Sequence, residues 1–296
     1  MIKSFINKKK YKYSEDVSIK NINSYRLSLK CKYLVFPKSV NELIDLIKFL
    51  KENDVKYMVL GGGSNVIFSC DYYDGVIIKL DYFKDISIRD CMVEVGAGYS
   101  LIKLATDMSL SGLSGLEFAC GIPGCIGASV AMNAGAYKHS LSEIVESVEV
   151  LNDKQEVITM TNDQIDFSYR DSFFKKNPGY VILSCKLKLS HGDKKEILRL
   201  ISNRRVRRIE TQPLEYPSAG SVFRNPEGMF AGELIEKCGL KGYKIGGAKV
   251  SEKHANFIIN DGGATGRDVV DLINKVKKEV KDNYNVDLIL EQIIID

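Results

Sequence analysis

Long apolar runs are missing from this sequence, and their absence removes whole classes of protein. No stretch of about 18 apolar residues occurs, so no transmembrane helix is predicted. Residues 1–13 are polar and basic with no apolar segment behind them, so we expect no secretory signal. The net charge is only +4, and basic clusters such as 8–10 and 204–208 are typical of solvated segments. We therefore expect neither a nucleic-acid partner nor a membrane partner.

Paired cysteines are missing too. The seven cysteines include no C-x-x-C pair, and no Cys/His group has the spacing of a zinc site, so no metal centre is predicted. Their odd number favours buried, reduced thiols in a cytosolic protein over a disulfide framework.

The remaining composition is that of an ordinary globular protein large enough for two domains. Of the 296 residues, 45% are hydrophobic and 27% are charged. Helical and β patterns mix without strict alternation, so the predicted fold class is α+β. We predict a loosely held arm (1–20), a first domain (21–195) and a second domain (196–296), in a monomer or at most a weak dimer.

Local signals predict most of the secondary structure. Ser39 and Glu42 form a capping-box pattern before a helical repeat. The other expected helices span 100–110, 193–209, 231–238 and 265–280, and the expected strands span 57–60, 76–80, 93–95, 145–151, 157–160, 181–189, 256–259 and 288–295.

Two segments rich in small residues indicate a bound cofactor. Gly61–Asn65 follows a predicted strand, and consecutive backbone N–H groups in such a loop can cradle a diphosphate, although a tight turn would explain it equally well. The loop matches neither G-x-G-x-x-G nor the P-loop. Residues 112–135 carry Gly and Ala where a core would carry Leu and Val, which leaves room for a large flat group. Tight backbone packing without a ligand is the alternative.

Three motifs together resemble a known family. G-G-G-S-N (61–65), G-x-E-F-A-x-G-I-P-G (115–124) and M-N-A-G-A-Y (132–137) resemble the vanillyl-alcohol-oxidase class of FAD-binding domains. Within that class, residues 20–296 are similar to the UDP-N-acetylenolpyruvoylglucosamine reductase family. The resemblance implies FAD as cofactor, NADPH as co-substrate and a small sugar-nucleotide substrate. It implies that the FAD diphosphate is held by Gly61, Gly62, Gly63, Ser64 and Asn65, and that the flavin is lined by Gly121, Ile122, Pro123, Gly124, Gly127, Ala128, Asn133, Gly135 and Ala136.

Reducing an enol ether that carries a carboxylate requires a hydride, a positive group for the developing enolate, and an acid. Residues 169–175 resemble the family's arginine motif, which implies that Arg170 meets the enolate and that Tyr169 lies at the substrate. Arginine suits this role because it holds a carboxylate with two parallel hydrogen bonds. A structural salt bridge to Asp166 or Asp171 is the alternative.

Residues 212–226 resemble the segment that carries the proton donor, which implies that role for Ser221 and a sugar-nucleotide contact for Asn225. Capping a turn is the alternative for Ser221. The motif at 288–292 implies that Glu291 completes the site, with a pKa that burial would raise. Residues 249–260 imply that Lys253 and His254 meet the substrate diphosphate.

Three positions depart from the family pattern. Ser28 and Leu29 stand where a glycine pair is usual, and Ile293 stands where an arginine is common. The 51 positions between Arg170 and Ser221 indicate the subclass without an extra tyrosine-bearing loop. A flavoenzyme with another substrate and a non-catalytic binding protein on the same fold are the competing hypotheses.

Overall fold

A computed structural model describes residues 1–296. Its contacts divide the chain into two compact units that interleave along the sequence. Unit 1 comprises Met1–Glu15, Tyr33–Gly61 and Gly75–Arg205, and unit 2 comprises Asp16–Lys32, Gly62–Asp74 and Val206–Asp296. The predicted boundaries at 20/21 and 195/196 do not coincide with the changes of unit. The predicted α+β class is confirmed, because both units mix helices with largely antiparallel sheets.

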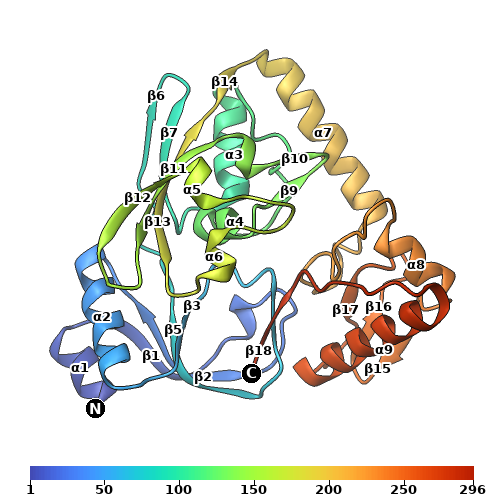
Figure 1. Ribbon diagram of the computed structural model, residues 1–296, viewed down its shortest axis with the longest axis horizontal. Helices are drawn as coiled ribbons and strands as arrows, with labels where there is room; N and C mark the ends of the chain where they lie inside the picture. The colour runs from blue at the N-terminus through green and yellow to red at the C-terminus, as the bar shows by residue number, and fades with distance from the viewer. The chain divides into compact units, whose positions relative to one another are not determined.

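A five-stranded antiparallel sheet forms the centre of unit 1 (Figure 1). Its strands, in spatial order, are β12 (Val157–Thr161), β11 (Val145–Leu151), β13 (Val181–Lys188), β7 (Met92–Gly96) and β6 (Ile86–Arg89). Leu183, Cys185 and Leu187 are buried, while the residues between them are partly exposed. The predicted alternation of a half-buried strand is therefore confirmed, because successive side chains of a strand point to opposite faces.

Helices α2 (Val40–Glu52), α3 (Leu101–Leu110) and α4 (Ile126–Ala131) supply buried side chains to the core of unit 1. Ser39 begins α2 and accepts a hydrogen bond from the Glu42 backbone N–H at 3.2 Å. The Glu42 carboxylate accepts from the Lys38 N–H instead of completing the predicted box. Helix α4, which packs against β13 and β7, was not predicted, because its Gly- and Ala-rich sequence has no apolar periodicity.

Unit 2 contains a three-stranded antiparallel sheet of β15 (Lys244–Ile245), β16 (Ala248–Val250) and β17 (Ile258–Asn260). Helix α9 (Gly266–Tyr284) packs against β15 and β16, and α8 (Ala231–Lys237) packs against α9. Thr265 begins α9 with a complete capping box to Asp268. The predicted final strand is shorter than expected: β18 (Ile293–Ile295) pairs in parallel with β4 (Val66–Phe68), and the residues before it form only an isolated bridge.

A four-stranded sheet has the order β1 (Lys12–Ser18), β2 (Lys30–Phe36), β5 (Tyr72–Ile78) and β3 (Tyr57–Val59). The first three strands run from one unit into the other. The prediction of a loose arm at 1–20 was wrong: α1 (Ile2–Lys8) precedes β1, and Ile6 is fully buried in the core of unit 1. The signal was weak because β1 is an edge strand whose residues are largely exposed.

The predicted charged helix is α7 (Lys194–Thr211), in which only Ile197 is buried. The chain changes unit within it, after Arg205. No helix combines the length and apolar character that crossing a bilayer requires. The remaining short elements are η1 (Lys20–Ile22), β8 (Leu113–Ser114), β9 (Gly135–Ala136), β10 (His139–Ser140), η2 (Leu141–Glu143), α5 (Asn162–Ile165), α6 (Phe173–Lys176) and β14 (Ser190–His191).

The cap on α2 gives a direct stability test. Replacing Ser39 with Ala should lower the free energy of unfolding of unit 1 by about 1 kcal/mol, because the Glu42 N–H loses its partner. Ser39→Asp should retain wild-type stability, since aspartate caps equally well. Urea denaturation followed by circular dichroism measures both, and an unchanged midpoint for Ser39→Ala would exclude the cap.

Candidate functional site

Arg170 lies on a tight turn of unit 1. Ser168 and Asp171 exchange two backbone hydrogen bonds of 3.1 Å, and Arg170 between them has a φ of 56°. A left-handed conformation is unfavourable for a side chain with a Cβ, and such residues persist where surrounding contacts fix them. The guanidinium Nη2 donates to the Gly135 carbonyl at 2.6 Å, and the guanidinium carbon Cζ lies 5.3 Å from the centre of the exposed Tyr169 ring. Of the two acids in the competing salt-bridge assignment, Asp166 pairs with Lys176 at 3.4 Å, and the Asp171 carboxylate accepts the Ser172 N–H at 2.9 Å.

Two further contacts bind this turn to the end of α4. Asn133 is buried, donates through Nδ2 to the Ser168 carbonyl at 2.8 Å and accepts the Ser142 N–H at 3.0 Å. The Ser172 hydroxyl donates to the Ala131 carbonyl at 2.7 Å. The structure therefore brings together the motifs at 132–137 and 169–175. Asn133, predicted to touch the flavin, uses its amide to hold the arginine turn.

The first glycine of the predicted diphosphate loop lies in unit 1, directly after β3. A Cβ on Gly61 would come within 2.5 Å of the Ala128 Cβ, so only glycine permits this approach to α4. Lys79, only 9% exposed, donates from its ammonium to the Gly61 carbonyl and lies 3.8 Å from Asp81. This lysine was not predicted, although a single charge within the apolar run 76–80 was a signal for it.

The remainder of the loop belongs to unit 2. Gly63 has a φ of 65°, and a Cβ there would lie 2.0 Å from the Ile22 carbonyl oxygen, which excludes other residues. The Asn65 side chain donates to the Glu291 carbonyl at 3.1 Å, and the Asn65 carbonyl accepts the Ile293 N–H at 2.9 Å. Gly62 is exposed and Ser64 is half-buried.

A surface of small residues accompanies Gly61 in unit 1. Pro123 and Ala128 are exposed and Gly121, Ile122 and Gly124 are half-buried, although Ile126 and Val130 close by are completely buried. Gly127 packs so closely on Ala97 that a Cβ would lie 2.9 Å from the Ala97 Cβ. An accessible apolar surface made of backbone and short side chains fits the flat ring of a flavin, so the residues present suit the implied cofactor.

Ser221 and Glu291 lie on neighbouring segments of unit 2. The Glu291 N–H donates to the Val222 carbonyl at 2.8 Å, and Phe223 and Leu290 form an antiparallel bridge. Gly220, which precedes Ser221, has a φ of 75°. Both Ser221 and Glu291 are half-buried. The backbone segments that carry the two residues implied in proton transfer are thus paired, although those residues lie 70 positions apart in the sequence.

A buried glutamine fixes the backbone around Ser221. Gln292 is 3% exposed, and its Nε2 donates to the carbonyls of Ala219, Gly220 and Ser221 at 3.0, 3.3 and 3.4 Å. Its Oε1 accepts from the Tyr25 hydroxyl at 2.9 Å, and burial raises the pKa of Tyr25 above its usual range, so the phenol remains a donor. Gln292 was not singled out from the sequence, although it adjoins Glu291 as a polar residue in an apolar run.

The Ser221 segment is fixed from its other side by Asn256. Asn256 is buried and exchanges side-chain hydrogen bonds with the backbone of Phe223, at 3.0 Å to its N–H and 2.8 Å to its carbonyl. Asn225 is exposed and accepts the Ala231 N–H at 3.1 Å, which satisfies the first turn of α8.

Lys253 and His254 make contacts within unit 2. Lys253 Nζ donates to the Ile209 carbonyl at 2.6 Å near the end of α7 and lies 3.8 Å from Glu215. His254 Nδ1 accepts the Asn256 N–H at 3.2 Å, so this nitrogen carries no proton. Burial lowers the pKa of His254, with the Lys241 charge contributing, which keeps the ring neutral near pH 7. A substrate contact for both side chains stays a prediction.

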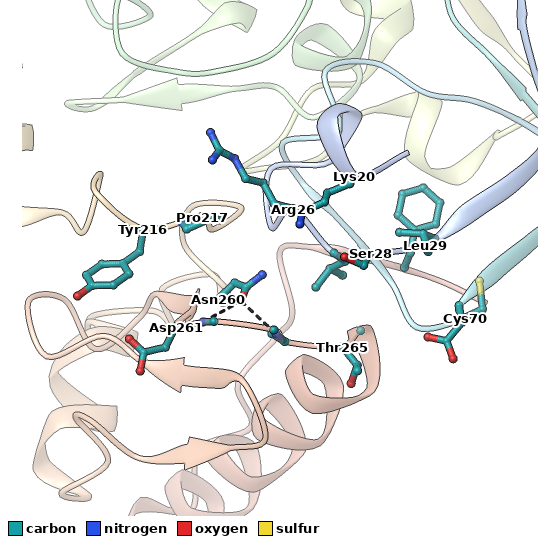
Figure 2. Close-up of a pocket in the computed structure, with 17 residues that line it drawn as sticks. Lys20, Arg26, Ser28, Leu29, Cys70, Tyr216, Pro217, Asn260, Asp261 and Thr265 are labelled. Atoms are coloured by element: carbon teal, nitrogen blue, oxygen red, sulfur yellow. Dashed lines mark hydrogen bonds between the residues drawn. The ribbon is translucent and has the colours of Figure 1, made fainter. Parts of the chain in front are cut away.

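Unit 2 also contains a pocket of about 450 Å³ (Figure 2). Arg26, Lys20 and Tyr216 line it together with the glycine-rich loop 260–266, in which Asn260 accepts the N–H groups of Gly262 and Ala264. Ser28 and Leu29, which replace the expected glycine pair, lie in this lining, whereas no predicted site residue does.

An accessible small-residue surface and a glycine loop are features expected of an FAD-binding protein. A family model described as FAD binding domain matches residues 31–161, and one for the C-terminal domain of UDP-N-acetylenolpyruvoylglucosamine reductase matches residues 212–295. The chain belongs to the UDP-N-acetylenolpyruvoylglucosamine reductase family, whose members are FAD-dependent oxidoreductases.

Similar proteins cover almost the entire chain. It is 47% identical to UDP-N-acetylenolpyruvoylglucosamine reductase of Bacillus subtilis (strain 168), over 88% of this chain and 87% of that protein. The Clostridium kluyveri reductase is 40% identical over 95% of this chain and 92% of that protein. The crystal structure of the Thermus caldophilus reductase matches with a TM-score of 0.81 and 31% identity, over 97% and 99% of the two chains.

The neutral state of His254 makes unit 2 sensitive to acid. Because the folded pKa lies below the unfolded value, the unfolded chain gains a proton first as the pH falls through about 6.5. The wild type should therefore lose more unfolding free energy than His254→Gln between about pH 7.5 and about pH 5.5. Urea titrations at both pH values test this, and equal losses in the two proteins would contradict a depressed pKa.

Proposed function

We propose that this protein reduces the enolpyruvyl group of UDP-N-acetylglucosamine enolpyruvate to the lactyl ether of UDP-N-acetylmuramate, with FAD as cofactor and NADPH as electron donor. This reaction supplies the precursor of bacterial peptidoglycan. The family membership supports the assignment. The observation that carries it is the backbone pairing of the Ser221 and Glu291 segments, which supports a hydroxyl and a carboxylate acting in the same protonation step.

The residues proposed to hold FAD are those of the glycine loop and the small-residue surface. Gly61 to Asn65 would bind the diphosphate through backbone N–H groups, and the segments 121–128 and 133–136 would line the ring. The Lys79 ammonium donates a hydrogen bond to the Gly61 carbonyl, so a positive charge adjoins the first residue of that loop. When bound, FAD supplies the hydride for the substrate's double bond.

Arg170 is proposed to stabilise the negative charge that develops on the substrate. Addition of a hydride to the methylene carbon moves the electrons of the double bond toward the carboxylate, forming an enolate. A guanidinium keeps its charge when desolvated and offers several donors in a fixed plane. The bond from Nη2 to the Gly135 carbonyl orients that plane before the substrate arrives, which is how a preorganised electrostatic site acts.

Ser221 is proposed to donate the proton that completes the reduction. Its Oγ–H bond breaks, the proton goes to the carbon that bears the carboxylate, and the enolate electrons form the new C–H bond. The serine then regains a proton from solvent, with Glu291 as the neighbouring acid–base group. The Gln292 bonds to three successive carbonyls support this role, because they fix the backbone that aims the hydroxyl.

Four residues are proposed to bind the sugar nucleotide: Tyr169, Asn225, Lys253 and His254. The exposure of the Tyr169 ring and the Asn225 side chain supports the first two. Lys253 could offer its ammonium, while a neutral His254 would act through its Nε2–H and not through charge.

We also propose that the protein works in the cytoplasm as a monomer or a weak dimer. Seven free cysteines suit a reducing compartment, in which NADPH is available.

Ser221→Ala should separate the two half-reactions. NADPH should still decrease the flavin absorbance at the wild-type rate. The recovery of that absorbance on adding the enolpyruvyl sugar nucleotide should slow by about 10²–10⁴-fold, which is the usual rate contribution of a general acid. Stopped-flow absorbance measures both steps. If the flavin absorbance of Ser221→Ala recovers at the wild-type rate, Ser221 has no role in the mechanism. If the flavin absorbance of the wild type never recovers with this sugar nucleotide, the protein acts on another substrate.

Arg170→Lys should lose most of the recovery rate, although the positive charge is kept, because an ammonium cannot replace the planar, forked donor set held at Gly135. The same stopped-flow measurement applies. Lys176→Met is a suitable control, since it removes a nearby surface cation that pairs with Asp166. Near-normal recovery in Arg170→Lys would favour a purely structural role for the arginine.

A further inference from the structure

Three side chains of different ligand type meet in unit 1, and none of them has been assigned a role above. The carboxylate of Asp90, the thiol of Cys91 and the imidazole of His191 place one ligand atom each within 4.8 Å of one another. His191 Nε2 and Asp90 Oδ1 lie 2.7 Å apart. The sequence did not predict this group, because His191 is distant from the other two along the chain.

Rigid backbone holds the three residues together. Asp90 and Cys91 form the two-residue turn between β6 and β7, where Arg89 pairs with Met92, and Asp90 has a left-handed φ of 55°. Strand β13 pairs with β7 up to Lys188, and the next residue, Leu189, donates its N–H to the Cys91 carbonyl at 2.8 Å. The chain therefore passes beside the turn just before His191.

The backbone of His191 is itself fixed. His191 lies on β14 and pairs with Leu113 of β8, and the Gly192 N–H donates to the Gly112 carbonyl at 3.0 Å. In Figure 1, β14 lies close to the β6–β7 turn. Ligands carried on paired strands and a tight turn need little ordering when an ion arrives, which favours binding.

We propose that Asp90, Cys91 and His191 form a zinc site with water as the fourth ligand. Thiolate, imidazole and carboxylate are the ligands that zinc takes in proteins, and three of them with one open position form a tetrahedral site. In such a site the Asp90 and His191 ligand atoms would lie about 3.3 Å apart, since each is about 2.0–2.2 Å from the ion. Their present hydrogen bond therefore has to widen only slightly.

Exposure allows that movement. The side chains of His191 and Asp90 are 73% and 78% exposed, so both can rotate and an ion can reach them from solvent. Cys91 is half-buried and supplies the ligand that binds zinc most strongly. Because none of the three residues belongs to the proposed catalytic machinery, the site does not depend on the proposed function.

An exposed His–carboxylate pair alone does not make a metal site, and the chain contains a matched example. His139 Nδ1 lies 2.8 Å from Glu143 Oε2, with both side chains about half exposed and without a cysteine in the group. The thiol is the feature that distinguishes the two pairs. His139→Gln and Cys70→Ser are therefore the control variants for His191→Gln and Cys91→Ser.

The test is zinc titration of the flavin-loaded protein after chelator treatment, by calorimetry, with X-ray absorption on the zinc-loaded sample. We expect one zinc per chain and a shell with one sulfur at about 2.3 Å and lighter atoms at about 2.0–2.2 Å. Cys91→Ser should remove the sulfur, and both it and His191→Gln should weaken binding at least about tenfold. The controls should bind as the wild type does.

The proposal would be overturned by no zinc bound at micromolar concentration, by a coordination shell without sulfur, or by equal affinity in wild type and Cys91→Ser. Flavin content and turnover should be unchanged in all four variants, which confirms that they are folded. A loss of zinc binding in His139→Gln or Cys70→Ser equal to that in His191→Gln or Cys91→Ser would also contradict it, by placing the ion elsewhere.

Discussion

The amide of Gln292 determines the backbone on which the proposed proton donor lies. It donates to three successive carbonyls at 219–221 and accepts from the buried Tyr25 hydroxyl, so both ends of one side chain are satisfied inside unit 2. A buried donor left without its acceptor costs about 1–3 kcal/mol, which makes alternative positions of this segment unfavourable. Glu291 is the residue next to Gln292, so the same anchor fixes the segment that carries the carboxylate.

In unit 1, side-chain hydrogen bonds likewise fix the backbone around Arg170. Asn133 and Ser172 bind the turn at 168–172 to the residues around the end of α4. Arg170 Nη2 donates a hydrogen bond to the Gly135 carbonyl. Each proposed chemical group thus stands on backbone that side-chain hydrogen bonds hold from distant parts of the sequence. Such preorganisation lets a weak acid and a fixed cation act without rearranging during the reaction. It also explains why small residues adjoin these segments, since backbone must approach backbone closely.

Local signals predicted much of the fold. Ser39, Ser100 and Thr265 begin helices, and the alternating pattern at 181–189 forms β13, because caps and periodicity depend on residues close in sequence. The interleaving of the two units, the folded arm and helix α4 had no such signal. In the candidate site, the motifs singled out Arg170 and Ser221, whose roles stay predictions, whereas Lys79 and Gln292 were missed. Their importance comes from contacts with carbonyl groups 18 and about 70 residues away, which no local pattern encodes.

Bound FAD is the claim on which the functional account depends, and its absorbance tests that claim most directly. The purified protein, or the apoprotein after addition of FAD, should show the flavin bands at one equivalent per chain. Addition of NADPH should decrease those bands, and the enolpyruvyl sugar nucleotide should restore them. A folded protein that stays colourless after FAD is added would contradict the account, whatever roles individual side chains were given.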